Sequence, residues 1–244
     1  MKIELEEQVK TMMEGLFEIE DIEQVPDLND PRLLFGSKSL GFEATVIYLE
    51  IKESGKILIQ QNEVTLVRVR MIYFYLVAEI AASLGGVARL AHDDGIYAFF
   101  QGTTQDSLNS AVKAAMKIKF MLTNEYSKVK KQLDTYSASN FVIGVDDGKV
   151  LCAKIGEGIC TYGDLVWSGQ ALTSAKAIAA QLDAPEHIGI SELVHYNLID
   201  NVKYNKSKTK TPNNFPVEIW KAAQFTYNDQ PFVYYHTSFF WTVS

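Results

Sequence analysis

The sequence is poor in cysteine, in histidine and in positive charge, and each shortage excludes a class of protein. Its 244 residues contain only two cysteines, Cys152 and Cys160, whose spacing fits neither a metal nor a redox motif, so a cytoplasmic protein is expected. His187, His195 and His236 are scattered and do not suggest a metal-binding trio. A net charge of −7 argues against nucleic acid as the main partner.

The chain also lacks a run of apolar residues suited to crossing a membrane. Its most apolar long stretch, 64–84, contains Arg68, Arg70 and Glu79, which is typical of a buried amphipathic helix. The acidic start has no hydrophobic signal-peptide core, and we expect no membrane association.

The spacing of apolar residues predicts an α+β fold with a ferredoxin-like core. Strands and helices are expected in the order βαββαβ. Their ranges are a strand over 42–51, a helix over 62–84, a hairpin over 88–100, a helix over 103–132, and strands 141–145 and 150–155 joined in a second hairpin across 146–149. A further helix over 170–182 and C-terminal strands extend this core. Residues 1–41 are expected to form a helix and an extended arm, and 42–244 one domain.

Acidic residues at a strand end and a hairpin tip are candidate ligands for Mg²⁺ or Mn²⁺. Glu50 ends the first strand, and Asp93 and Asp94 occupy the predicted turn of the first hairpin. Carboxylates at such positions can bridge a hard cation to a phosphate. The short loop after Glu50 contains Ser54 and Gly55, whose backbone N–H groups are candidate phosphate donors. The residues leave an alternative open: Glu50 is an exposed strand-edge residue, and the aspartates only form a turn.

Four segments together resemble the catalytic domain of the class III nucleotidyl cyclases, from Phe42 to Leu198. They are 48–51, 94–100, 143–156 and 167–192, in the order found in that family. The lead-in 25–28, the segment around Trp167 and the tail also resemble bacterial antiphage pyrimidine cyclases of the Pycsar type. The resemblance implies conversion of a nucleoside triphosphate, UTP or CTP, to a 3′,5′-cyclic mononucleotide and pyrophosphate. It also implies a role as the signal generator of an antiphage system.

The same resemblance implies a head-to-tail homodimer with active sites at the interface. Two metal ions would be held by Glu50, Ile51 and Asp94, with Asp93 as the ligand if the hairpin register is shifted by one. The partner subunit would supply an Asn and an Arg from the Ala-rich helix. Glu50 replaces the family's first metal-binding Asp, and its extra methylene changes the coordination geometry.

Further departures fall on the residues that contact the nucleotide. The positions of the family's Asn and Arg fall on Thr173 and Ala177. Lys176 is the neighbouring cation, but it points about 100° away from Ala177 around an ideal helix. Thr173 and Lys176 are the candidate catalytic residues that remain. Leu90 takes the place of the lysine that reads adenine in adenylyl cyclases, and Lys154 is a candidate phosphate contact.

These departures leave three readings. The chain is a divergent cyclase that works alone, one half of a heterodimer with a cyclase-like partner, or a degenerate homologue that acts by binding a nucleotide or another protein. A diguanylate-cyclase type competes with all three, because 89–94 stands where that type has an Arg-Leu-Gly-Gly-Asp-Glu run. The two glycines of that run are missing here.

Overall fold

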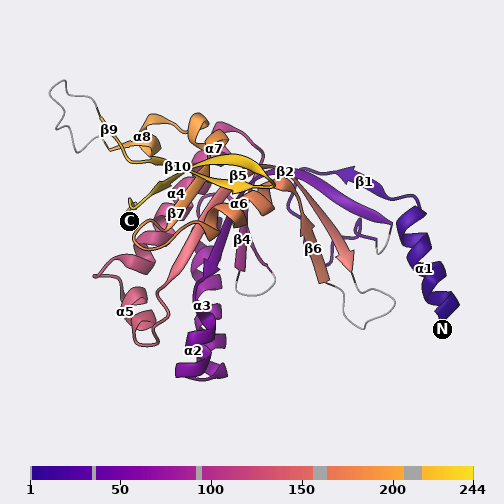
Figure 1. The fold of residues 1–244 in the computed structure, drawn as a ribbon, viewed down its shortest axis with the longest axis horizontal. Coiled ribbons are helices and arrows are strands. Elements are labelled where there is room, and N and C mark those ends of the chain that lie inside the picture. The colour runs from indigo at the N-terminus through magenta and orange to yellow at the C-terminus, as the bar shows by residue number, and fades with distance from the viewer. Residues whose placement is uncertain (1, 35–36, 92–94, 156–163, 206–215, 244) are drawn as a thin grey trace.

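The structure is a computed structural model that describes residues 2–34, 37–91, 95–155, 164–205 and 216–243. One large sheet carries the fold, with strand order β10-β11-β7-β5-β2-β4-β3, and with β1 paired to β2 and β6 paired to β5 (Figure 1). The strands of this sheet are β1 (Glu18–Asp21), β2 (Lys38–Ile51), β3 (Gly86–Leu90), β4 (Gly95–Gln101), β5 (Phe141–Ile155), β6 (Asp164–Ser168), β7 (Ile188–Ser191), β10 (Lys221–Tyr227) and β11 (Gln230–Thr237). The short strands β8 (Tyr204–Asn205) and β9 (Val217–Glu218) pair separately.

The helices lie between these strands along the chain. They are α1 (Lys2–Glu14), α2 (Ser54–Gln60), α3 (Glu63–Ala82), α4 (Gln105–Thr123), α5 (Lys128–Asp134), α6 (Gln170–Ala180), α7 (Glu192–Asn197) and α8 (Asp200–Lys203). The predicted βαββαβ core is confirmed as β2-α3-β3-β4-α4-β5, with the four strands side by side in the antiparallel order β5-β2-β4-β3.

Helices cover both faces of this core. Residues of α3 and α4 pack with odd-numbered residues of β2 and β5, such as Leu49 and Ile143, in the largest apolar cluster. Helix α6 packs on the opposite face, against Tyr48 and Val142. Because side chains alternate between the faces of a strand, even-numbered residues of β2 and β5 point toward α6.

The predicted second hairpin is wrong, because 141–155 form one continuous strand. β5 pairs with β2 in a single antiparallel register, from Ile51 opposite Phe141 to Ser39 opposite Ala153, which continues on both sides of Ala44 and Gly148. The residues expected to turn, Asp146 and Asp147, pair with Val46 and Thr45 inside this ladder. Long-range pairing along the whole of β2 overrides the local turn preference of an Asp-Asp-Gly sequence.

The predicted helix over 103–132 is also divided in two. Asn124 has an extended backbone, with ψ 127°, and ends α4. Ser127 then caps α5, because its hydroxyl accepts a hydrogen bond from the Lys130 backbone N–H at 3.3 Å. The start predicted for the preceding helix is confirmed, since the Asn62 side chain accepts from the Thr65 N–H at 2.9 Å.

The N-terminal arm joins the sheet through β1, which pairs in parallel with the first residues of β2. The expected domain boundary at residue 42 therefore falls within β2. Helix α1 projects from the body of the molecule (Figure 1), and apolar side chains such as Met13 and Leu16 are exposed. Across the described ranges, we find no helix with the length and apolar character needed to span a membrane.

Candidate active site

A pocket of about 260 Å³ lies where β2 ends and α2 begins. The chain turns there at Glu53, whose φ of 60° is left-handed, and α2 starts at Ser54. Seven residues line the pocket: Tyr48, Glu50, Ile51, Glu53, Ser54, Gly55 and Lys176. The structure thus brings five of the predicted site residues together, two from the end of β2, two from the start of α2 and one from α6.

The alternation of β2 places Glu50 on the same face as Tyr48, which is the face that α6 covers. Tyr48 is 3% exposed and packs with Ala175 of α6. The Nζ atom of Lys176 lies 5.8 Å from the centre of the Tyr48 ring. A carboxylate, a phenol ring and an ammonium group therefore meet at one end of the sheet.

The first hairpin reaches the same end of the sheet. Glu50 pairs with Gly95, the residue directly after Asp94. The Tyr48 ring lies over Gly95, where a Cβ atom would come within 2.6 Å of that ring. His92, Asp93 and Asp94 lie outside the described residues, so the pairing of Glu50 with Asp94 or Asp93 as metal ligands stays a prediction.

Charge in the pocket is dominated by carboxylates. A hydrogen bond from Lys56 lowers the pKa of Glu53, which is therefore ionised and paired at neutral pH. Among the described residues that line the pocket, Lys176 is the only basic one. Within the described parts of the chain, no group of three or more His, Cys, Asp or Glu side chains is placed to hold a metal ion.

The other predicted residues lie elsewhere. Thr173 is exposed on α6, and its hydroxyl donates to the Gln170 carbonyl of its own helix at 3.0 Å. Leu90 ends β3 with 65% of its surface exposed. Lys154 pairs with Leu165 between β5 and β6. None of the three lines the pocket at the end of β2.

Sequence reasoning missed Tyr48 and Glu53 as pocket residues. The sequence favours a packing role for Tyr48 and leaves a base-stacking role unassigned, although its position two residues before Glu50 in a strand predicts the same sheet face. Glu53 carries no sequence signal, because its placement depends on a left-handed residue between β2 and α2.

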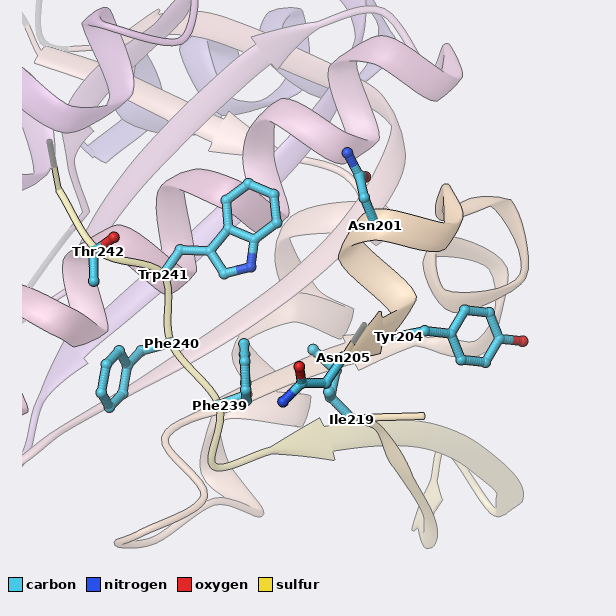
Figure 2. Close-up of a pocket in the computed structure, with 8 residues that line it drawn as sticks. All are labelled: Asn201, Tyr204, Asn205, Ile219, Phe239, Phe240, Trp241 and Thr242. Carbon is cyan, nitrogen blue, oxygen red and sulfur yellow. The ribbon is translucent and has the colours of Figure 1, made fainter. Parts of the chain in front are cut away.

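A second pocket, of about 440 Å³, lies between α8 and the C-terminal segment (Figure 2). It is lined by Asn201, Tyr204, Asn205, Ile219, Phe239, Phe240, Trp241 and Thr242. Its described lining includes neither a carboxylate for a metal nor a cation for a phosphate. The pocket at the end of β2 is therefore the better candidate for a triphosphate.

The fold and sequence both match nucleotide cyclases. The structure superposes on that of the guanylyl cyclase Cya2 with a TM-score of 0.62 and 18% identity, covering 82% of this chain and 93% of the other. A uridylate cyclase from Xanthomonas perforans is 28% identical over 213 residues, which is 86% of this chain and 88% of that protein. The chain has the fold of the class III nucleotidyl cyclases. A uridylate cyclase from Burkholderia cepacia is 24% identical to this chain, over 94% of this chain and 93% of the relative. No family model matches the chain.

Proposed function

We propose that this cyclase domain is a uridylate cyclase, which converts UTP to 3′,5′-cyclic UMP and pyrophosphate. The observation that carries the proposal is the similarity, over most of both chains, to proteins named uridylate cyclase. The pocket at the end of β2 supports it, because that pocket combines Glu50 with the backbone of Ser54 and Gly55. CTP is the second candidate substrate, since its base is also a pyrimidine.

In this reaction the ribose 3′-oxygen attacks the α-phosphorus in line with the departing pyrophosphate. A bond forms between the 3′-oxygen and the α-phosphorus, and the bond from the α-phosphorus to the oxygen that bridges it to the β-phosphorus breaks. The 3′-hydroxyl proton passes to solvent. The protein's contribution is to orient the triphosphate and to offset its charge. We assign the orientation to the N–H groups of Ser54 and Gly55 at the start of α2.

A divalent metal, Mg²⁺ or Mn²⁺, would neutralise charge on the triphosphate when bound. The donors of this pocket fit such an ion, because the Glu50 carboxylate and the Ile51 carbonyl are hard oxygen ligands. Glu50 would hold the ion together with Asp94, or with Asp93 if the hairpin register differs. Glu50 and Gly95 are already paired across β2 and β4, which supports this assignment.

The proposed setting is a cytoplasmic homodimer whose cyclic product signals in an antiphage system. The resemblance to Pycsar-type cyclases supports this part of the proposal. A heterodimer with a cyclase-like partner is the alternative, because Thr173 and Ala177 replace the family's Asn and Arg.

The test is to incubate the purified protein with ATP, GTP, CTP or UTP and Mn²⁺, and to detect cyclic products by mass. Cyclic UMP is expected, with activity lost on adding a chelator and lowered at least about 10²-fold in Glu50→Ala. Glu125→Gln, an exposed carboxylate between α4 and α5, is the matched control and should keep full activity. Absence of product from every triphosphate would contradict the proposal, and saturable UTP binding would then favour a nucleotide-binding module.

A further inference from the structure

Two sides of α6 differ in what they can reach. Thr173, Lys176 and Ala180 are exposed on this helix, whereas Ala175 and Ile178 are buried against the sheet. Lys176 lies about 100° around the helix axis from Ala177. That rotation directs Lys176 into the pocket of its own chain, where it lines the same cavity as Glu50.

A close contact between α6 and β5 fixes the height of this lysine above the sheet. Gly144 of β5 lies under Ala175, and a Cβ atom at Gly144 would be only 1.9 Å from the Ala175 carbonyl oxygen. The glycine therefore lets the helix backbone approach the strand directly. Because Ala175 precedes Lys176, the same contact places the base of the Lys176 side chain near the end of β2.

The Tyr48 ring supports the other end of that side chain. Tyr48 is buried under α6, and the Lys176 ammonium group lies 5.8 Å from its ring centre. A cation over an aromatic ring is attracted by the ring's negative face. Lys176 is thus held over the pocket, beside Glu50.

The charge of the pocket indicates that Lys176 can offset the charge of a bound triphosphate. A triphosphate carries several negative charges and would meet the carboxylates of Glu50 and Glu53. Lys56 already hydrogen-bonds Glu53. Among the described lining residues, only Lys176 brings a further positive charge. Fixed cations close to the transferring phosphoryl group stabilise the charge that develops there.

We propose that Lys176 acts in cis: it contacts the triphosphate bound in the pocket of its own chain and stabilises the charge on the departing pyrophosphate. This inference rests on the proposed cyclase function. It differs from a site completed by a cation from a partner subunit, because Glu50 and Lys176 belong to one polypeptide. No bond to Lys176 forms or breaks, and its proton stays on the ammonium group.

The first experiment is single substitution. Lys176→Met should lower kcat for cyclic UMP formation by about 10²–10³-fold, and Lys176→Arg should retain a large part of it. Lys128→Met, an exposed lysine at the start of α5, is the matched control and should behave like the unaltered protein. Full activity of Lys176→Met, with circular dichroism showing a native fold, would overturn the proposal.

Mixing two inactive variants tests whether Lys176 acts on the pocket of its own chain (cis) or on that of the partner subunit (trans). Glu50→Ala and Lys176→Met chains are unfolded together, refolded at equal amounts and assayed. A cis site leaves every pocket defective, so activity stays at the level of the variants. A trans site would regenerate one complete pocket in each mixed dimer and about a quarter of the activity of the unaltered protein, which would overturn the proposal. Refolding the unaltered protein alone verifies that refolding succeeds, and native mass spectrometry of the mixture verifies that mixed dimers form.

Binding separates this inference from the proposed function. If the unaltered protein makes no cyclic product, the proposed function fails. Lys176 is then tested with UTP and Mg²⁺ by calorimetry. A loss of about tenfold or more in UTP affinity in Lys176→Met, with Lys128→Met unchanged, would support the contact in its own pocket. Equal affinity of the three proteins would overturn it.

Discussion

Asp146 is a carboxyl group buried in the middle of β5, and its replacement by asparagine gives a quantitative test of the fold. Only 8% of its surface is exposed, and it lines a cavity of about 630 Å³ between β5, β11 and the start of α7. Burial raises the pKa of Asp146 from its ordinary value of 3.8 to about 6, although a hydrogen bond with Ser191 opposes the shift.

The raised pKa fixes the sign of the effect on stability. Between pH 4 and pH 6 the folded chain keeps a proton that the unfolded chain has released, so the free energy of unfolding falls as pH rises through this window. The difference between 3.8 and about 6 corresponds to about 3 kcal/mol at 1.36 kcal/mol per pH unit. Above pH 6 the folded state bears the whole of this penalty.

Asp146→Asn should therefore stabilise the protein at neutral pH and not at acidic pH. The amide is uncharged at every pH, and it can hydrogen-bond the Ser191 hydroxyl as the Asp146 carboxyl does. At pH 7.5 we expect the free energy of unfolding to rise by up to about 3 kcal/mol, and Tm to rise by roughly 6–12 °C. At pH 4 we expect almost no change in either quantity.

The measurement is urea and thermal unfolding followed by circular dichroism at both pH values. Glu125→Gln removes an exposed carboxylate and should show no such pH-dependent difference. An equal change in Tm at pH 4 and pH 7.5, or destabilisation at pH 7.5, would refute the assignment of a raised pKa to a buried Asp146.

Two further substitutions test the packing around the site. Gly144→Ala would force α6 away from β5, because the new methyl group would lie 1.9 Å from the Ala175 carbonyl oxygen; we expect a loss of about 3 kcal/mol or more in urea unfolding and a fall in cyclase activity. Tyr73→Phe removes the buried hydroxyl that donates to the Ala138 carbonyl at 2.7 Å; the expected loss is about 1–2 kcal/mol, with kcat unchanged because α3 lies on the opposite face of the sheet from α6. Unchanged stability of the first variant, or lost activity of the second in protein that unfolds cooperatively, would contradict this account.

One tripeptide shows how far local sequence determines the fold. Asp-Asp-Gly occurs at 93–95 and again at 146–148. At the first position the flanking strands β3 and β4 pair with each other, as predicted. At the second, residues 146–148 stay extended because the residues of β5 before and after them also pair with β2. Turn preference is the same in both cases, and the difference lies in which distant strand is available.

The end of β2 was predictable because its residues are close in sequence. Glu50, Ile51, Ser54 and Gly55 lie within six residues, and a strand followed by a short turn brings them to one edge of the sheet. Lys176 belongs to a helix far along the chain, and its periodicity defines a buried side without defining its position over the strands.

That position depends on two small residues that make no chemical contribution. Gly144 and Ala175 let α6 lie directly on β5, and the resulting height and rotation carry Lys176 to Glu50 of its own chain. In the family pattern, Ala177 falls at the position of an arginine, which indicates that a cation has been lost. The packing of α6 instead shows a lysine one residue earlier and about 100° away, directed at a different pocket. Loss of a cation on one side of a helix does not exclude a functional cation on the other, and the chain that provides Glu50 also provides Lys176.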